Sequence, residues 1–134
     1  RTMVKNAESD GAVFTAANDS RVTAFGKFMR KTRMDEFPQF INILKGDMAV
    51  IGPRPERPIF VKEIAEIMPF YETRHIIKPG LTGWAQVNYS YGETIDDSLI
   101  KLQYDLYYIK HRSIYLDMNI AFKTITTILF YRGQ

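Results

Sequence analysis

Residues 33–56 constrain the fold and the chemistry of this chain more than any other segment. Two adjacent carboxylates, Asp35 and Glu36, come just before Pro38, and proline is favoured in the first turn of a helix because its missing N–H is not needed there. A carboxylate at this position meets free backbone N–H groups and the positive end of the helix dipole. It should therefore stay ionised and able to act as a nucleophile or a metal ligand. Gly46 is expected to end this helix.

A proline-flanked arginine follows the predicted helix. Residues 48–51 are apolar and predict a short buried strand, after which Gly52, Pro53 and Pro55 predict a stiff turn that displays Arg54. The planar guanidinium of Arg54 suits bidentate binding of a phosphate. Carboxylates and arginine in this order favour a site that handles a phosphate ester.

The composition limits the other kinds of site. The 134 residues predict one domain, residues 1–134, and contain no cysteine and two histidines. A disulfide framework and a Cys/His metal site are therefore excluded, whereas a hard cation held by carboxylates is not. The net charge of +3 is modest, and we expect no nucleic-acid partner. Basic residues gather before the carboxylate pair, where they suit a diphosphate substrate or anionic lipid headgroups: Arg21, Lys27, Arg30, Lys31 and Arg33.

The periodicity of apolar residues predicts a mainly helical α+β fold with a few short strands. No apolar run reaches the length of about 18 residues that a membrane-spanning helix needs. We expect Asp19 or Ser20 to cap the first helix, and the second helix to bury Phe40, Ile41 and Leu44. Helices are predicted over residues 21–31, 37–45, 58–67, 94–111 and 113–131, and strands near residues 12–15, 48–51 and 84–87.

Five segments in fixed order resemble one family of bacterial enzymes. They are Asp35-Glu36-Phe37-Pro38-Gln39, Lys45-Gly46-Asp47-Met48, Gly52-Pro53-Arg54-Pro55, residues 78–87 and residues 104–110. Together they look like the bacterial sugar transferases, the monotopic polyprenyl-phosphate phosphoglycosyl transferases. The resemblance implies transfer of a sugar 1-phosphate from a UDP-sugar to undecaprenyl phosphate, with release of UMP. It assigns Asp35 as the nucleophile that forms an aspartyl-phosphate sugar intermediate and Glu36 as a partner in binding Mg²⁺.

The resemblance also implies a cellular location. Members of the family act at the cytoplasmic face of the bacterial inner membrane and carry an upstream re-entrant helix, which we expect this chain to lack. The segment 87–93 is similar to members tied to exopolysaccharide production, and capsule or O-antigen synthesis are the other expected pathways. A second copy of the chain is a candidate partner, although the sequence does not fix the oligomeric state.

Four further residues are candidates for the site. Arg30 and Arg54 are expected to bind substrate phosphates or to orient the carboxylates. From the resemblance, Asp105 is expected to orient Arg30, and Asp117 is a weaker candidate site residue. Each has a plainer alternative: Asp35 and Glu36 could cap a helix, Arg30 could lie on a solvated face, and Asp117 could favour a helix dipole.

Aromatic residues leave two questions open. Trp84, Tyr89 and Tyr91 could stack on a nucleobase or lie at a lipid interface, but a tryptophan beside a glycine turn more often belongs to a core. The last two predicted helices combine aromatic and basic residues, which favours contact with a membrane surface. A rival to the enzyme is therefore a non-catalytic basic module that docks on membrane or on partner proteins of a polysaccharide assembly.

Overall fold

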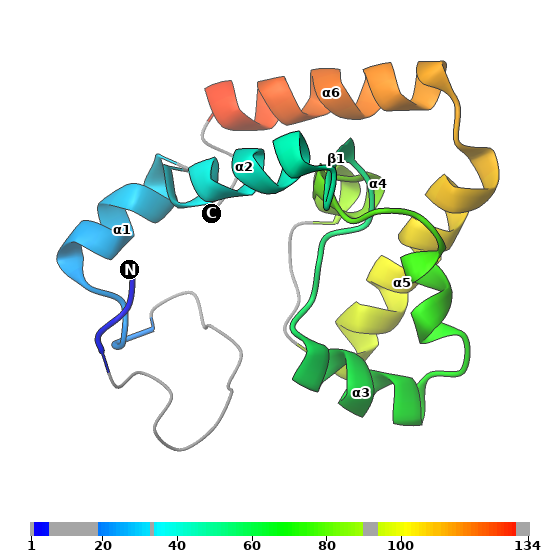
Figure 1. Ribbon diagram of the computed structural model, residues 1–134, viewed down its shortest axis with the longest axis horizontal. Helices are drawn as coiled ribbons and strands as arrows, with labels where there is room; N and C mark the ends of the chain where they lie inside the picture. The colour runs from blue at the N-terminus through cyan, green and yellow to red at the C-terminus, as the bar shows by residue number, and fades with distance from the viewer. Residues whose placement is uncertain (1, 6–18, 33, 90–93, 131–134) are drawn as a thin grey trace.

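The computed structural model describes residues 2–5, 19–32, 34–89 and 94–130, and it is mainly helical with one small parallel sheet (Figure 1). This confirms the predicted α+β class. The predicted strand at residues 12–15 lies outside the described residues. In chain order the elements are α1 (Ala24–Lys31), the 3₁₀-helix η1 (Met34–Glu36), α2 (Phe37–Lys45), β1 (Ala49–Ile51), α3 (Pro58–Ile67), the 3₁₀-helix η2 (Tyr71–Ile76), β2 (Gly80–Thr82), α4 (Trp84–Asn88), α5 (Ile95–His111) and α6 (Ile114–Leu129).

The helix ends follow local chemistry. Gly46 ends α2 in the left-handed conformation that favours glycine, and Pro58 begins α3, so both helices have the predicted bounds. The Thr94 hydroxyl accepts a hydrogen bond from the Asp97 N–H while the Asp97 carboxylate accepts one from the Thr94 N–H, which forms a capping box at the start of α5. Ser113 caps α6 in a similar way.

Two predictions about local structure were wrong. Thr23 caps α1 by accepting a hydrogen bond from the Gly26 N–H at 2.9 Å, in place of Asp19 or Ser20. Residues 84–87 belong to the one-turn helix α4 and do not form a strand. The Val87 N–H donates to the Gly83 carbonyl and the Tyr89 N–H donates to the Ala85 carbonyl, so these groups form helical hydrogen bonds and not sheet hydrogen bonds.

The sheet joins two distant parts of the chain. β1 and β2 run parallel, with Ala49 opposite Gly80 and Ile51 opposite Thr82. The backbone at Gly80 passes very close to the backbone at Gly52. A Cβ added to Gly80 would lie only 2.1 Å from the Gly52 nitrogen. A side chain larger than hydrogen at this position would push the strands apart. The turn after β1 is thereby fixed against the segment after η2.

The core has two parts. The first lies between α3, η2 and the N-terminal half of α5, and the second lies at the corner where α5 meets α6. The buried residues are Phe60, Ile64, Met68, Tyr71 and Leu102 in the first part, and Tyr108, Leu116 and Ile120 in the second. Both parts include a buried residue of α5, Leu102 in the first and Tyr108 in the second, so α5 links the two parts of the core.

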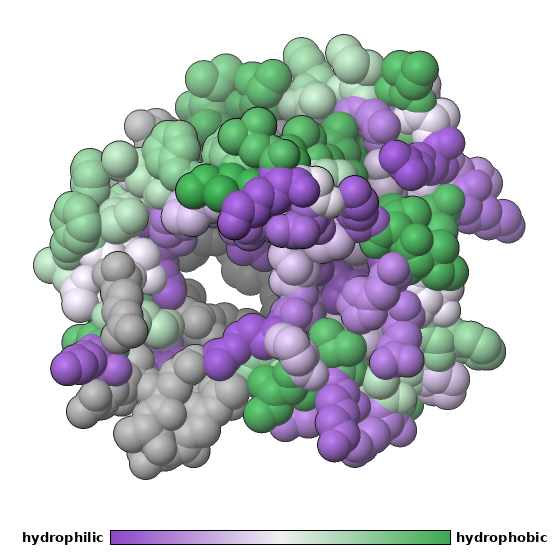
Figure 2. Space-filling view, in the orientation of Figure 1, coloured by the Kyte–Doolittle hydropathy of each residue, from purple (hydrophilic) through white to green (hydrophobic). Residues whose placement is uncertain are grey.

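Three helices expose apolar faces. The predicted burial of Phe40, Ile41 and Leu44 on α2 was wrong, since Leu44 is 88% exposed and the other two are about half exposed. Figure 1 shows α1, α2 and α6 along one edge of the molecule, and Figure 2 shows hydrophobic residues over that edge. We call this surface the apolar belt; its exposed members are Phe25, Phe28, Phe37, Phe40, Ile41, Leu44, Ile114, Tyr115, Met118, Phe122, Ile125, Ile128, Leu129 and Phe130. Within the described residues, no helix has the length and apolar composition needed to cross a membrane.

Candidate active site

Asp35 and Glu36 lie where η1 runs into α2, at the N-terminus of that helix. Pro38 stands in the first turn of α2, as predicted. Glu36 occupies the N-cap position but its side chain does not cap the helix. The Oδ1 atom of Asp35 is buried and has no hydrogen-bond partner among the described residues. A buried carboxylate oxygen without a partner is costly, so this atom is available for a group beyond the described residues, such as a bound ligand.

Arg54 faces this carboxylate pair. Its Nη1 lies 3.5 Å from Glu36 Oε1, and the exposed fraction of the side chain is 45% for Arg54 and 18% for Glu36. The contact is long and uses one nitrogen of the guanidinium, so it leaves the remaining donors of Arg54 for another acceptor. The structure therefore brings Arg54 to Glu36, the chain neighbour of Asp35, although Arg54 is 18 residues away from Glu36 in sequence.

The turn that carries Arg54 is held by three hydrogen bonds on consecutive residues. The Gly52 N–H donates to the Thr82 carbonyl at 2.9 Å, and the Gly80 N–H donates to the Pro53 carbonyl at 2.8 Å. The third bond comes from Arg74, whose Nη2 donates to the Arg54 carbonyl at 2.8 Å. Each partner lies on the segment from η2 to β2, which makes that segment the support of the turn.

Asp105 does not orient Arg30, which corrects the expectation from sequence. Its carboxylate accepts a hydrogen bond from Arg74 Nε at 3.1 Å and forms an ion pair with Arg74 Nη2 at 2.8 Å, and both side chains are almost fully buried. Burial raises the pKa of the Asp105 carboxyl to about 6, and Arg74 opposes that rise. Arg74 was missed by the sequence reading. The signal was an aspartate within an apolar helix, which needs a cationic partner, but the sequence does not say which one.

Arg30 lies on α1. Its charge acts on Asp19, where it adds to the larger effect of Arg21. Arg21 donates hydrogen bonds to the Asp19 carboxylate, and these hold the pKa of Asp19 at about 2, below its ordinary value of 3.8. The role of Arg30 on a substrate phosphate stays a prediction.

Asp117 lies at the corner between α5 and α6. The Tyr108 hydroxyl donates to Asp117 Oδ1 at 2.7 Å. Burial raises the pKa of Tyr108 to about 12, and the hydrogen bond to Asp117 adds to the rise. This contact joins the two helices within the second part of the core, so it gives Asp117 a structural role beside its place in the first turn of α6.

Trp84 is surrounded by protein side chains. Lys123 Nζ lies 4.6 Å from the centre of the indole, and the Tyr107 ring stacks on it with centroids 6.2 Å apart. The Tyr89 hydroxyl donates to the Asp97 carboxylate, while Tyr91 lies outside the described residues. These contacts favour the packing interpretation of Trp84 over stacking on a nucleobase.

The described residues contain no cluster of three or more His, Cys, Asp or Glu side chains that could hold a metal ion. A site that draws on one or two carboxylates and completes its coordination with substrate phosphates and water needs no such cluster. Asp35 Oδ1 and the Glu36 carboxylate are donors of this kind.

Known proteins resemble the chain over nearly all of its length. The sequence model of the bacterial sugar transferase family matches residues 1–131. A UDP-N-acetylgalactosamine-undecaprenyl-phosphate N-acetylgalactosaminephosphotransferase of Aeromonas hydrophila is 54% identical over 96% of this chain and 30% of its own length. A UDP-glucose:undecaprenyl-phosphate glucose-1-phosphate transferase of Escherichia coli is 43% identical over 91% of this chain and 27% of its own length.

A shorter relative is covered more fully. An uncharacterised sugar transferase of Bacillus subtilis, EpsL, is 34% identical over 99% of this chain and 62% of its own length. The chain thus spans about 30% of the length of the Aeromonas and Escherichia relatives. The matched region includes the carboxylate pair, the arginine turn and the segment that supports it. The chain belongs to the bacterial sugar transferase family.

Proposed function

We propose that this chain carries the catalytic site of an enzyme that transfers a sugar 1-phosphate from a UDP-sugar to undecaprenyl phosphate. The observation that carries the proposal is the buried, unpartnered Oδ1 of Asp35 beside Glu36 and Arg54. The names of the Aeromonas and Escherichia relatives support the two substrates, a UDP-sugar and undecaprenyl phosphate. The product would start a unit of exopolysaccharide, capsule or O-antigen.

The reaction proceeds in two displacements at one phosphorus atom. An Asp35 carboxylate oxygen attacks the β-phosphorus of the UDP-sugar, a P–O bond forms, and the bond to the bridging oxygen breaks. UMP leaves with that oxygen and its electron pair. A phosphate oxygen of undecaprenyl phosphate then attacks the same phosphorus and displaces the Asp35 carboxylate. The products are UMP and undecaprenyl diphosphate sugar, and Asp35 returns to its starting state.

Charge is the main obstacle to the first displacement, because an anionic carboxylate must approach an anionic diphosphate. Arg54 would lower this barrier, since it contacts Glu36 through one nitrogen and its other donors can bind a phosphate oxygen. Glu36 accepts a hydrogen bond from Arg54 Nη1 at 3.5 Å, which limits the orientations that the Arg54 guanidinium can take. The N-terminus of α2 adds positive potential at Asp35.

Mg²⁺ is the cofactor that we propose for this site, with Asp35 Oδ1 and Glu36 as its protein donors. Two neighbouring carboxylates suit this ion, which commonly takes one or two carboxylates together with substrate phosphates. When bound, it would neutralise phosphate charge and align the diphosphate. The remaining work falls to the protein: Asp35 attacks, Arg54 binds phosphate, and the helix terminus keeps the attacking oxygen ionised.

The membrane surface at the cytoplasmic face of the inner membrane is the proposed location of the reaction. Undecaprenyl phosphate is confined to lipid, so the site must lie near a bilayer. The apolar belt along α1, α2 and α6 supports this location, because exposed apolar faces of this extent suit the interface of a membrane. We also propose that two copies of the chain can form a homodimer.

A trapping experiment tests the covalent step. Full-length protein, undecaprenyl phosphate and a panel of UDP-sugars should release UMP in the presence of Mg²⁺, and Asp35→Asn should abolish the release while the fold stays intact. With labelled UDP-sugar and no lipid acceptor, the label should remain on the peptide that contains Asp35. A label on another peptide, or an active Asp35→Asn variant, would show that the nucleophile is misassigned.

The same assay separates the enzyme from its rival. A non-catalytic docking module and the enzyme both bind membrane, but only the enzyme releases UMP in a manner that depends on Asp35. A protein that binds vesicles and releases no UMP from any UDP-sugar would support the docking module.

A further inference from the structure

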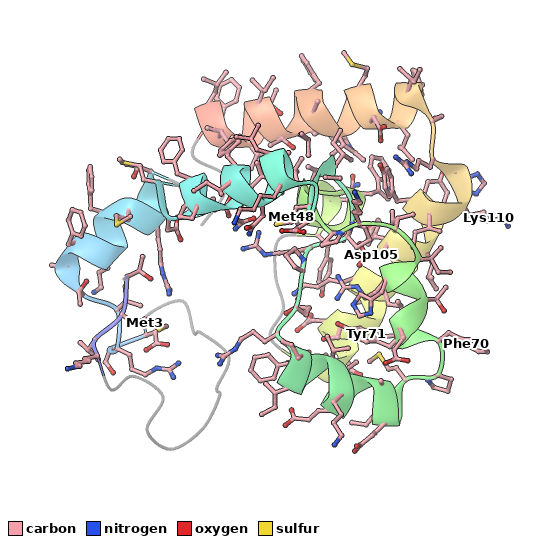
Figure 3. The ribbon with its side chains drawn as sticks, viewed as in Figure 1. Met3, Met48, Phe70, Tyr71, Asp105 and Lys110 are labelled. Carbon is pink, nitrogen blue, oxygen red and sulfur yellow. The ribbon has the colours of Figure 1, made fainter. Side chains whose placement is uncertain are left out.

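Arg74 is a buried arginine that joins three separate segments of the chain. Its Nη1 donates to the Tyr71 hydroxyl at 2.8 Å, its Nε donates to Asp105, and its Nη2 donates to the Arg54 carbonyl and forms an ion pair with Asp105. Arg74 is 4% exposed, Tyr71 is 3% exposed and Asp105 is 1% exposed. Figure 3 shows Tyr71 and Asp105 in the interior, where they extend from η2 and α5. A guanidinium can serve all of these acceptors because its donors point in fixed, different directions.

The contact to Arg54 is unusual within this network because Arg54 is exposed. The Arg54 side chain is 45% exposed and reaches Glu36, while the carbonyl of the same residue receives a hydrogen bond from a buried cation. The network therefore connects the interior with the candidate active site through backbone, without any side-chain contact between the two arginines. A purely structural ion pair would need only Arg74 and Asp105.

The geometry explains what this backbone contact controls. The peptide group before Arg54 is held through the Pro53 carbonyl, which accepts from Gly80, and the peptide group after it is held through the Arg54 carbonyl. Fixing both peptide planes fixes both φ and ψ of Arg54. Pro55 narrows the choice further, since a residue before proline is confined to extended conformations. The direction in which the Arg54 side chain leaves the backbone is then determined.

We propose that Arg74 is a positioning residue for the transferase reaction, and that it acts by fixing the backbone of Arg54 so that the guanidinium faces Glu36. Asp105 orients the Arg74 guanidinium through Nε, and the Tyr71 hydroxyl accepts from its Nη1. The effect on catalysis rests on the proposed function, whereas the control of the Arg54 backbone does not. Arg74 itself touches neither of the two carboxylates at the N-terminus of α2.

A double-mutant cycle between Arg74 and Arg54 tests the catalytic part. In the full-length protein, Arg74→Lys should lower kcat/KM by about 10- to 100-fold, since an ammonium group loses the directed bond to the Arg54 carbonyl. In an Arg54→Ala background the same change should cost less than about twofold, because there is no guanidinium left to position. Equal losses in both backgrounds would overturn the proposal, since Arg74 would then act on the fold alone.

Two further variants distinguish a loss of positioning from a loss of protein stability. Asp105→Asn keeps the shape of the carboxylate but weakens its hold on Arg74, so it should show the same dependence on Arg54 with a smaller loss. Ile64→Val removes one methylene from the core beside Tyr71 and should lower the melting temperature without lowering kcat/KM at a temperature where the protein is folded. If Ile64→Val and Arg74→Lys lose activity in proportion to stability, the positioning role is wrong.

A spectroscopic measurement works without any turnover. The chain has no cysteine, so a nitroxide on Arg54→Cys can report the mobility of the turn by electron paramagnetic resonance, once any cysteine elsewhere in the gene product is replaced. The motion of the label should be restricted in the protein that keeps Arg74 and in the Ile64→Val variant. It should be greater in the Arg74→Lys variant. An unchanged spectrum in Arg74→Lys would overturn the proposal. If the wild-type protein releases no UMP but Arg74→Lys still increases the mobility of the label, the proposed function is wrong and the role of Arg74 in fixing the Arg54 backbone stands.

Discussion

At the scale of single residues, Arg54 is placed by its neighbours and its side chain remains available. The contact with Glu36 uses Nη1, and nearly half of the side chain is exposed. Arg54→Ala should therefore lower kcat/KM by roughly two to three orders of magnitude, or about 2 to 4 kcal/mol of transition-state stabilisation. Arg54→Lys should restore little, since an ammonium keeps the charge and loses the planar fork. Steady-state kinetics of UMP release measures both effects.

Arg57 provides the matched control for this comparison. It follows the same turn, and its guanidinium lies 5.7 Å from the centre of the Phe60 ring. Arg57→Lys should keep near-normal kcat/KM because this contact is made within the protein. Full activity in Arg54→Lys would show that charge alone is needed and that the geometry of the fork is irrelevant.

Glu36 carries a prediction about metal. Chelation with EDTA should stop UMP release, and added Mg²⁺ should restore it, if the carboxylate pair and substrate phosphates hold the ion. Glu36→Gln should shift the Mg²⁺ dependence of the rate to higher concentration, because an amide oxygen is a weaker ligand for a hard cation. Normal activity of Glu36→Gln at low Mg²⁺ would remove Glu36 from the metal site.

Asp19 carries a prediction about pH. Its pKa is lowered from 3.8 to about 2 by the hydrogen bonds from Arg21, so the folded state favours the ionised form. The stabilisation is complete above a pH of about 4 and is lost as the pH falls toward 2. The difference in melting temperature between wild type and Asp19→Asn should be constant above this range and shrink within it. A constant difference down to pH 2 would contradict the assignment.

Local sequence signals pointed to Asp35, Glu36 and Arg54 but not to Arg74. Asp35, Glu36 and Arg54 stood out because proline and glycine mark their local structure. Arg74 had no such mark, since its role depends on three partners that only the tertiary fold brings together. Asp105 was recognised, but its partner was predicted wrongly. A buried ion pair joins residues 31 positions apart here, and no local pattern encodes that distance.

At the scale of elements, helix bounds were predictable where a backbone signal was present. Gly46, Pro58 and Thr94 each mark the end or start of a helix, and the structure uses them in that way. The helix α4 was mistaken for a strand because Trp84 and Val87 are residues that favour strands. One turn of helix is too short to show a helical period, so the pattern carried no signal against the strand.

The parallel strand pair yields a prediction about two glycines. A Cβ on Gly80 would lie 2.1 Å from the Gly52 nitrogen and 2.6 Å from the Thr82 carbonyl oxygen, so Gly80→Ala must separate the strands. Gly46→Ala meets only the flexible end of Lys78 at 3.8 Å, but it forces alanine into a left-handed conformation.

Chemical denaturation should rank these two variants. Gly46→Ala should cost about 1 kcal/mol of unfolding free energy, and Gly80→Ala should cost more. Gly80→Ala should also lower kcat/KM, because the Gly80 N–H holds the Pro53 carbonyl beside Arg54. A Gly80→Ala variant as stable and as active as Gly46→Ala would mean that the strands separate without moving the turn.

At the scale of the whole molecule, the apolar belt makes the edge formed by α1, α2 and α6 distinct, because exposed apolar residues gather there. Amphipathic patterns located the helices, but they could not show that α1, α2 and α6 turn apolar faces outward. The aromatic residues of the last two helices differ in burial: Tyr108 is buried in the core, whereas Tyr115 and Phe122 are exposed. Lys123, a basic residue of the last helix, donates to Asn88 and lies over the Trp84 ring, and Tyr131 and Arg132 lie outside the described residues.

The apolar belt should bind membrane directly, with Phe122 among its anchors. The 134-residue chain should sediment with vesicles rich in phosphatidylglycerol and leave them at high salt, since each Lys or Arg near anionic headgroups adds about 1 kcal/mol. Neutral vesicles should hold it weakly. Phe122→Ser should reduce binding, whereas Phe70→Ser should not, because Phe70 is equally open to solvent but lies away from α6 (Figure 3). Equal losses in both variants would mean that the belt has no special role. Binding to neither kind of vesicle would mean that these apolar faces do not serve membrane attachment.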